Sequence, residues 1–207
     1  MKRAFSLLLL TLLTLSFTLG TLSSCGGTRG EIVVELYPSV APETVDNFVT
    51  LATSGFYDGL TFHRAQEGFM IQGGDPEADG TGSSPNKIKG EFLANGFNNT
   101  LSHTRGVISM ARRGDSYDSA SCQFFICNAD ATFLDGQYAA FGEVVEGMDV
   151  VDGITYSMAR YGDSMGTVEL KNKHAVIEKT TIENTEDGRV LAHITVTNFE
   201  YKIDNKK

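Results

Sequence analysis

The sequence predicts a mainly β domain, either an antiparallel barrel or a sandwich, and three observations support this. Many short segments rich in β-branched and aromatic residues are separated by glycine-rich loops. Only two segments show the residue spacing of an amphipathic helix. Strand-like and helix-like segments do not alternate as they would in the βαβ units of a parallel sheet. At 207 residues, the chain is long enough for one domain with a substantial core.

The first 24 residues have the layout of a secretory signal peptide. Two basic residues are followed by a mostly apolar run, and no further charge occurs until Arg29. The stretch Leu-Ser-Ser-Cys at 22–25 resembles the bacterial lipobox, in which small residues precede a cysteine that is lipidated and becomes the new N-terminus after cleavage. We therefore expect a signal peptide over 1–24, lipidation of Cys25 and a short linker over 25–30. The alternative is an uncleaved transmembrane anchor, since the run is about long enough to span a bilayer.

Both alternatives tether the domain outside the cytoplasm, and the lipobox predicts a lipid anchor in a bacterial cell membrane. Loss of the two basic residues at the start leaves 15 basic against 26 acidic residues, so the formal net charge changes from −9 to −11. A surface with this excess of negative charge repels phosphate groups. The composition therefore argues against nucleic acid as a partner.

Local patterns predict the elements in turn. Residues 31–37 alternate apolar and polar side chains, as a half-buried strand does. Residues 41–56 are predicted as a helix, because Pro42 suits a first turn, acidic residues lie near the start, and apolar residues recur on one face. Gly55 ends this helix. Further strands are predicted at 60–65, 68–72, 106–111, 123–127, 138–145 and 175–183, with a short helix near 147–154.

The C-terminal residues 184–207 are predicted as an extension of a domain that covers 31–183. Asp187 and Gly188 form a strong hairpin signal between two strand-like runs. Apolar residues then alternate on one face of the following run. We therefore expect an added strand or hairpin that packs on the domain, followed by a frayed, lysine-rich end.

Cys122 and Cys127 are not expected to form a disulfide with each other. They flank four residues of a predicted strand, where an odd separation points the two side chains to opposite faces. Five residues of strand also span ~16 Å, whereas a disulfide needs the Cα atoms within ~7 Å. Both are predicted to be small buried hydrophobic residues.

Five blocks of the sequence, in this order and spacing, resemble cyclophilin-type peptidyl-prolyl isomerases: TFHRAQEGFMIQGGD at 61–75, GTG at 80–82, ISMAR at 108–112, SCQFFIC at 121–127 and FLDGQYAAFGEVVEG at 133–147. The resemblance covers about residues 30–182. It implies a closed eight-stranded antiparallel β-barrel capped by two α-helices, and it leaves the C-terminal run, predicted above as an extra strand or hairpin, unexplained. It also implies a monomer without a cofactor that acts on X-Pro bonds of proline-containing peptides and of unfolded or exported proteins.

The resemblance makes Arg64 the catalytic arginine, with Gln72 beside it. Rotation about an X-Pro bond faces a barrier of about 18–20 kcal/mol, because resonance gives the amide C–N bond partial double-bond character. A guanidinium that donates a hydrogen bond to the prolyl nitrogen favours the non-conjugated geometry of the twisted state. Arginine suits this task because it stays charged and presents a rigid fork of donors.

The same resemblance assigns eleven further residues to the peptide-binding groove: Phe62, Phe69, Met70, Gly80, Ala111, Arg112, Gln123, Phe125, Phe133, Leu134 and Tyr138. The apolar ones would seat the proline ring, and the glutamine would hold Arg64 and the substrate backbone. The backbone near Ala111 would bind the residue before the proline. Because Gln123 and Phe125 are two apart on one strand, they should face the same way, while Phe124 and Ile126 face the core.

Three groove positions depart from the family pattern. Arg112 stands where the family has asparagine, Phe133 where many members have tryptophan, and Tyr138 where many have histidine. A backbone contact survives the first change. The tryptophan is linked in the family to cyclosporin binding through its indole N–H, so weak inhibition by cyclosporin is expected here.

Two functions other than catalysis also fit these features. A non-catalytic peptide-binding module or holdase could use the same groove, and a purely structural surface protein would also fit the tether. Without the ordered blocks, Arg64 would be read as a solvated charge and the groove phenylalanines as core residues. Ser102 and His103 are adjacent on extended chain and so point apart, which argues against a catalytic triad. No metal site is expected, because the histidines lack ligand spacing: His63, His103, His174 and His193.

Overall fold

The computed structural model describes residues 28–160 and 174–201. The predicted signal peptide, Cys25 and the lysine-rich end lie outside the described residues. In chain order the elements are β1 (Thr28–Leu36), α1 (Pro42–Thr53), β2 (Thr61–Gln66), β3 (Met70–Asp75), the short 3-10 helix η1 (Leu93–Asn95), β4 (Val107–Met110), β5 (Phe124–Cys127), the 3-10 helix η2 (Thr132–Leu134), β6 (Ala140–Glu146), α2 (Met148–Arg160), β7 (Val176–Asn184) and β8 (Val190–Phe199).

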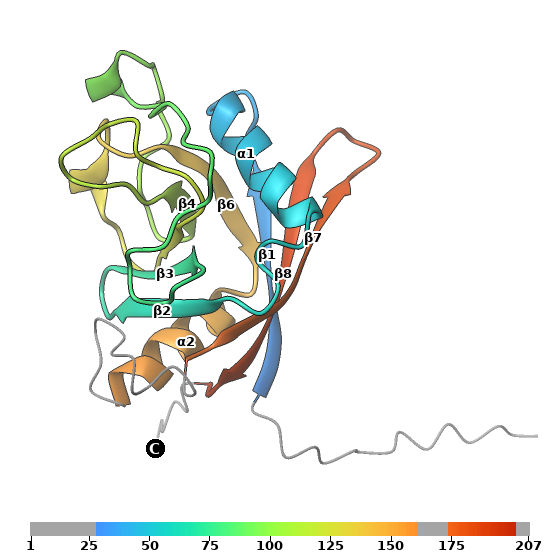
Figure 1. Ribbon diagram of the computed structural model, residues 1–207. Coiled ribbons are helices and arrows are strands. Elements are labelled where there is room, and N and C mark those ends of the chain that lie inside the picture. The colour runs from blue at the N-terminus through green and yellow to red at the C-terminus, as the bar shows by residue number, and fades with distance from the viewer. Residues whose placement is uncertain (1–27, 161–173, 202–207) are drawn as a thin grey trace, which may run out of the picture.

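The strands of the described chain close into one barrel, in which every paired neighbour is antiparallel. Their order around the barrel is β1-β6-β4-β5-β3-β2-β7-β8. The two α-helices lie at opposite ends of the barrel (Figure 1). The predicted fold class, a closed eight-stranded antiparallel barrel with two helices, is confirmed.

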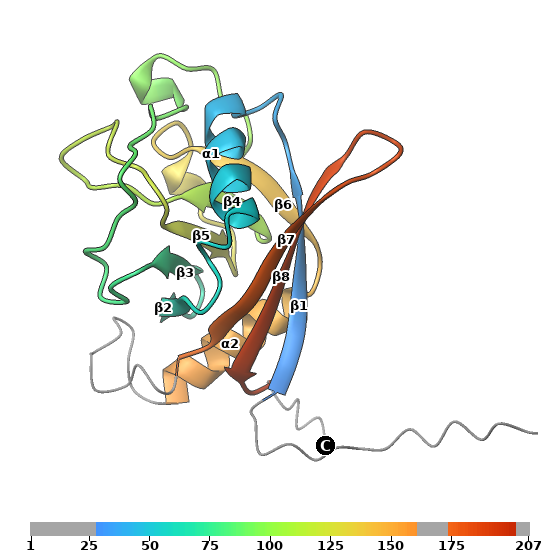
Figure 2. The same cartoon turned by 45° about the vertical axis from the view of Figure 1, so that its right-hand side comes forward.

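The C-terminal strand β8 is part of the barrel wall. It pairs along its length with β1 on one side and with β7 on the other (Figure 2). Ala192, Ile194 and Val196 on its inner face have no exposed surface. The predicted strand is therefore present, but it is the eighth strand that closes the barrel and not an addition to a complete one. The alternation of apolar residues could not distinguish a strand of the barrel wall from a strand added to a complete barrel, because either strand buries one face.

Two element boundaries differ from the prediction. β1 begins at Thr28, inside the expected linker 25–30, because the long partner β8 extends the pairing to Phe199. At Gly30, a Cβ atom would lie 2.7 Å from a methyl carbon of Val150, so the strand lies closely against α2 there. The helix α2 runs on to Arg160, beyond the expected 147–154, because its apolar side continues to bury residues in the main core.

A buried carboxylate from a distant loop caps helix α1. The N-cap residue Ala41 has no side chain that could accept a hydrogen bond from the first turn. Glu91, only 3% exposed, accepts hydrogen bonds from the backbone N–H of Glu43 at 3.1 Å and of Thr44 at 2.8 Å. It also accepts one from the Thr44 hydroxyl at 2.7 Å. This carboxylate satisfies free amides at the positive end of the helix and fixes the loop against it.

The two described cysteines lie on opposite sides of the β5 region. Cys122 belongs to the main core inside the barrel, and Cys127 belongs to a small separate cluster on the outside. Both are free thiols, as the odd spacing predicts. Burial raises the pKa of the Cys127 thiol to about 12, so it stays protonated and unreactive at neutral pH.

Within residues 28–160 and 174–201, none of the helices combines the length and the apolar composition that crossing a lipid bilayer requires.

Candidate active site

A β-bulge in β2 directs Arg64 out of the barrel. In the pairing of β2 with β3, Phe62 lies opposite Gly73. Arg64 lies opposite Gln72, so the intervening His63 has no partner of its own on β3. On a regular strand, residues two apart face the same side, but the extra residue of a bulge reverses this. Arg64 therefore lines a groove on the outside of the barrel.

The same bulge sends Phe62 into the main core, so its predicted role in the groove is wrong. The Phe62 side chain has no exposed surface. Its ring packs edge-on against Phe124, with the ring centroids 6.0 Å apart. The sequence predicts a regular strand here, in which Phe62 and Arg64 would face the same side. The bulge that separates them is defined only by the pairing of β2 with β3.

A chain of amide hydrogen bonds holds the Arg64 guanidinium. Gln123 Nε2 donates to the carbonyl oxygens of Gly80 at 3.2 Å and Gly82 at 2.8 Å. Gln123 Oε1 accepts from Gln72 Nε2 at 2.7 Å. Gln72 Oε1 in turn accepts from Arg64 Nη1 at 3.3 Å. The two carbonyl groups fix the orientation of the Gln123 amide, and the Gln123 oxygen then fixes the orientation of the Gln72 amide. An oxygen of Gln72, and not its NH₂ group, therefore faces the guanidinium.

Asp75 anchors the loop to which this chain is attached, and the sequence analysis assigned it no role. Its side chain accepts hydrogen bonds from the backbone N–H groups of Glu77 at 2.9 Å, Asp79 at 3.2 Å and Gly80 at 2.5 Å. The residue is 1% exposed. A Cβ atom at Gly82 would lie 1.9 Å from its carboxylate, so glycine is required there. Aspartate side chains commonly accept hydrogen bonds from backbone amides a few residues further along the chain, so an aspartate before a glycine-rich loop could have indicated this role.

A groove of about 410 Å³ lies beside Arg64. All its lining residues were predicted from the sequence: Arg64, Phe69, Met70, Gln72, Ala111, Arg112, Phe125, Phe133, Leu134 and Tyr138. The predicted residues Gly80 and Gln123 line a second pocket that adjoins this groove. Of the predicted site residues in the described chain, only Phe62 lies away from both spaces.

The groove has an apolar floor. A small cluster outside the barrel, which includes Met70, Phe125 and Leu134, packs separately from the main core. Phe125 points into this cluster while its neighbours Phe124 and Ile126 point into the barrel, as the alternation predicts. Such a floor can bury a small apolar ring, and the loss of water from its surface favours binding.

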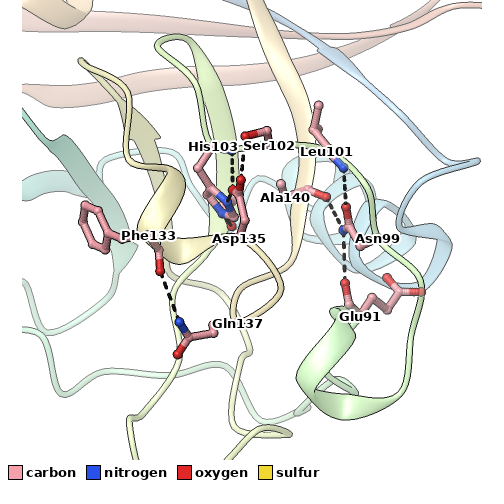
Figure 3. Close-up of polar contacts among 10 residues, drawn as sticks. Glu91, Asn99, Leu101, Ser102, His103, Phe133, Asp135, Gln137 and Ala140 are labelled. Carbon is pink, nitrogen blue, oxygen red and sulfur yellow. Dashed lines mark hydrogen bonds and ion pairs between the residues drawn. The ribbon is translucent and has the colours of Figure 1, made fainter.

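Phe133 forms an exposed apolar edge of the groove. Its side chain is 66% exposed, and its ring lies 5.5 Å from the ring of Phe69, measured between centroids. The backbone carbonyl of Phe133 accepts a hydrogen bond from Gln137 Nε2 at 3.1 Å, which fixes the turn behind the ring (Figure 3). Phe133 lacks the indole N–H of the tryptophan that many family members have at this position. Weak inhibition by cyclosporin therefore stays a prediction.

Arg112 also lines the groove, where aromatic rings and carbonyl groups hold its side chain. Its guanidinium carbon lies 4.6 Å from the ring centroid of Tyr138 and 5.1 Å from that of Tyr117. Nε donates to the carbonyl of Gln137 at 3.0 Å, and Nη1 donates to the carbonyl of Arg113 at 2.9 Å. These contacts orient the side chain without neutralising its charge. Arg112 and Tyr138, two departures from the family pattern, are therefore direct neighbours.

A buried histidine supports the groove from behind, and the sequence analysis missed this role. His103 Nδ1 lies 2.9 Å from Asp135 Oδ1, and its backbone N–H donates to the same oxygen at 2.8 Å (Figure 3). His103 Nε2 lies 3.0 Å from Ser109 Oγ. The ring stacks on Phe125, with centroids 6.0 Å apart and planes at 15°. His103 thus ties the floor residue Phe125 to the turn that carries Leu134.

This serine, histidine and aspartate set is not a nucleophilic site. Ser109 and His103 have no exposed surface, so a substrate carbonyl cannot reach the hydroxyl. The imidazole donates to the carboxylate through Nδ1, which leaves Nε2 to accept from the serine. Burial lowers the pKa of His103, although the hydrogen bond to Asp135 opposes this. The ring is therefore neutral at pH 7 and acts as a structural link.

A further space that also borders Arg64 is lined by His63, Arg64, Gln72, Asp79 and Gly80. Neither ring nitrogen of His63 has a hydrogen-bond partner among the described residues. Burial lowers the pKa of His63, so its ring is neutral at pH 7 and adds no positive charge beside Arg64. No group of three potential metal ligands occurs within residues 28–160 and 174–201.

Comparison with known proteins agrees with this geometry. The family model described as cyclophilin type peptidyl-prolyl cis-trans isomerase/CLD matches residues 21–187. A peptidyl-prolyl cis-trans isomerase of Helicobacter pylori is 45% identical over 128 residues, which are 61% of this chain and 75% of that protein. The isomerase ppi1 of Schizosaccharomyces pombe is 45% identical over 122 residues, or 58% of this chain and 76% of that protein.

A solved structure shares the fold. The crystal structure of a cyclophilin type peptidyl-prolyl cis-trans isomerase of Cryptosporidium parvum, in the presence of the dipeptide Ala-Pro, matches with a TM-score of 0.59. The two sequences are 22% identical, and the match covers 87% of this chain and 98% of that one. At this identity the likeness concerns the barrel alone. Together with the family model and the similar sequences, it leads to one conclusion: the chain belongs to the cyclophilin-type peptidyl-prolyl cis-trans isomerase family.

Proposed function

We propose that the domain accelerates rotation about X-Pro bonds, with Arg64 as the catalytic residue. The observation that carries this proposal is the state of the Arg64 side chain at the edge of the apolar groove. Arg64 lines the groove beside its apolar floor, and the Gln72 oxygen, which accepts a hydrogen bond from Nη1, holds the guanidinium in place. An arginine side chain carries five N–H donors, and among the described residues this one donates only to Gln72 and, at 3.5 Å, to Gln66. N–H groups of the guanidinium therefore remain for a peptide bound in the groove.

The chemistry requires no bond to be made or broken by the protein. A proline ring seated on Phe125 and Met70 would lie beside the Arg64 guanidinium. As the amide twists, the prolyl nitrogen becomes pyramidal and gains a lone pair that can accept a hydrogen bond. Donation from Arg64 is then stronger in the twisted state than in either planar isomer, which lowers the barrier. Lowering it by ~7 kcal/mol would accelerate rotation about 10⁵-fold.

The names of the relatives support the same activity. The proteins of Helicobacter pylori and Schizosaccharomyces pombe are both named peptidyl-prolyl cis-trans isomerases. The Cryptosporidium parvum structure was determined with Ala-Pro, a proline-containing dipeptide. We accordingly propose proline-containing peptide segments as the substrate class of this chain. We also propose a monomer as the active form.

We further propose that the protein is a bacterial lipoprotein that acts on exported proteins. The uncharged run before Cys25 and the small residues Ser23 and Ser24 support this proposal. X-Pro isomerisation takes tens of seconds and can limit folding, which gives an isomerase outside the cytoplasm a purpose. In the expressing bacterium, the wild type should incorporate radiolabelled palmitate, and Cys25→Ala should not. A membrane-bound wild type that takes up no label would argue for the uncleaved anchor instead.

A peptide assay tests the catalytic proposal. The rate of cis-to-trans conversion of a short Ala-Pro peptide is measured with the wild-type protein, with Arg64→Ala and with Arg29→Ala, a matched control on an exposed arginine of β1 that pairs with Glu178. We expect acceleration by the wild type and by Arg29→Ala, and a loss of at least about 100-fold in Arg64→Ala. Saturable binding without acceleration would support a non-catalytic peptide-binding module. Equal rates for the wild type and Arg64→Ala would defeat the assignment of Arg64.

A further inference from the structure

A second pocket adjoins the proline groove and differs from it in chemistry. It has a volume of about 480 Å³ and shares Gln72, Ala111 and Arg112 with the groove. The groove is floored by aromatic and aliphatic side chains, whereas the rest of this pocket is formed by glycine, hydroxyl, amide and basic residues. A peptide bound in the groove can therefore extend into a polar space without leaving the protein surface.

The charged side chains that line this pocket are all basic: Lys87, Arg112 and Arg113. No carboxylate is among its lining residues, although the chain as a whole carries a formal charge of −9. A cluster of basic side chains therefore creates a local positive field in the pocket, although the net charge of the chain is negative. This field attracts a carboxylate and repels an ammonium group.

Two of the three charges are free of carboxylate partners in the described parts of the chain. Arg113 forms a two-point ion pair with Asp115, in which both hydrogen bonds measure 2.9 Å, so its charge is largely neutralised. Arg112 instead donates to carbonyl groups and stacks on aromatic rings. Lys87 makes no hydrogen bond or ion pair with the described residues. Arg112 and Lys87 therefore leave a net positive charge in the pocket.

The position of the pocket relative to the groove indicates which part of a peptide reaches it. Ala111 lies on the boundary of the two spaces, and its backbone N–H is already bonded to the Gln123 carbonyl at 2.9 Å. The resemblance to the family implies that the backbone near Ala111 binds the residue before the proline. The pocket then lies on the N-terminal side of a bound proline.

We infer that this isomerase selects proline segments that carry an acidic side chain two or three residues before the proline, and that Lys87 and Arg112 supply the selectivity. The inference rests on the proposed function, because it uses the same groove to bind the proline. A charge-assisted hydrogen bond at a partly exposed site corresponds to about a tenfold preference. Because the site is open to solvent, the preference should weaken as salt is added.

The test uses two series of peptides with a common Ala-Pro-Phe core, in which glutamate, alanine or lysine occupies the second or the third residue before the proline. Values of kcat/KM are measured for the wild type, for Lys87→Glu and for Lys89→Glu. Lys89 is an exposed lysine two residues away that does not line the pocket, so it is a matched control for the charge change. The readout is the ratio of the glutamate peptide to the lysine peptide at the same position.

In the wild type we expect a ratio of about ten at one of the two positions, carried mainly by KM, and a ratio near one in 1 M salt. Lys87→Glu should bring the ratio to one or below, whereas Lys89→Glu should keep it. Equal kcat/KM for all three peptides at both positions would overturn the inference. If no peptide is accelerated, the proposed function fails, and the same ratio measured in binding affinities then decides the inference separately.

Discussion

Gln72 Nε2 donates a hydrogen bond to Gln123 Oε1 at 2.7 Å, and this bond determines which end of the Gln72 amide meets Arg64. If the Gln72 amide were reversed, its NH₂ group would face the guanidinium, and two donors would oppose each other. Gln123 cannot reverse either, because its NH₂ group is held by the carbonyls of Gly80 and Gly82. The orientation of the Arg64 guanidinium thus depends on the loop that carries Gly80 and Gly82.

Removal of the central amide should therefore weaken catalysis. We expect Gln72→Ala to lower kcat/KM about tenfold, the size of one hydrogen bond that positions a charged group. Gln66 also meets Arg64, at 3.5 Å, but it is exposed and lies outside the relay, so Gln66→Ala should cost less than about threefold. Both are measured with the peptide assay. Similar losses in the two variants would contradict the role given to the relay.

The cap on helix α1 predicts a stability effect far from the groove. Glu91→Ala leaves the first-turn amides of Glu43 and Thr44 without an acceptor, so the free energy of unfolding should fall by about 1–3 kcal/mol. Glu91→Gln keeps one acceptor oxygen and should lose less. Glu146→Ala, on an exposed strand residue, should change it by less than about 0.5 kcal/mol. Urea unfolding monitored by circular dichroism checks all three, and an unaffected Glu91→Ala would contradict the cap.

Closure of the barrel by β8 predicts the outcome of a C-terminal truncation. Deletion of residues 184–207 removes a strand that is paired on both sides, and it exposes the edges of β1 and β7. We expect a chain that does not fold cooperatively and aggregates on expression. Far-UV circular dichroism and thermal melting test this. A truncated protein with the melting point of the wild type would show that β8 is not needed to close the barrel.

Two buried histidines predict a loss of stability in acid. Burial lowers the pKa of both His63 and His103 below the ordinary value of 6.5. The unfolded chain therefore takes up these protons at a higher pH than the folded protein does. Between the two pKa values the unfolded state binds more protons, so the free energy of unfolding decreases as the pH falls below about 6.5. Above that pH this contribution is fully present.

Substitution of one histidine should reduce this dependence. The ring nitrogens of His63 have no partner among the described residues, so His63→Leu removes one titrating group without removing a described hydrogen bond. We expect a shallower slope of unfolding free energy between pH 7 and pH 5, with a reduction of up to about 1.4 kcal/mol per pH unit. The slope is measured by urea unfolding at several pH values. An unchanged slope would contradict the burial of a neutral His63.

The sequence predicts most of the fold and of the groove because these depend on local patterns. The alternation around Phe125 and the helical spacing after Pro42 both reappear in the structure. The position of Phe62 could not be predicted, since the bulge at His63 is defined only by pairing with another strand. The membership of β8 in the barrel depends likewise on its two partners.

The supporting residues of the site were missed for a related reason. Asp75 and His103 act through bonds to residues brought together by folding, and their types alone fit many roles. Asp135 lies 32 residues from His103 in the chain, so no local spacing reveals their contact. Arg112 was recognised as a departure from the family pattern, but its stacking on Tyr138 follows only from the structure.

The most direct test of the account is the exchange rate between cis and trans isomers of a saturating Ala-Pro peptide, measured by NMR on the wild type and on Arg64→Lys. Lysine keeps the charge but lacks the rigid fork that the Gln72 oxygen orients. We predict a fall in exchange rate of at least about 100-fold in Arg64→Lys, with the melting temperature and the affinity for the peptide nearly unchanged. Exchange at the wild-type rate in Arg64→Lys would contradict the claim that a directed guanidinium hydrogen bond lowers the barrier.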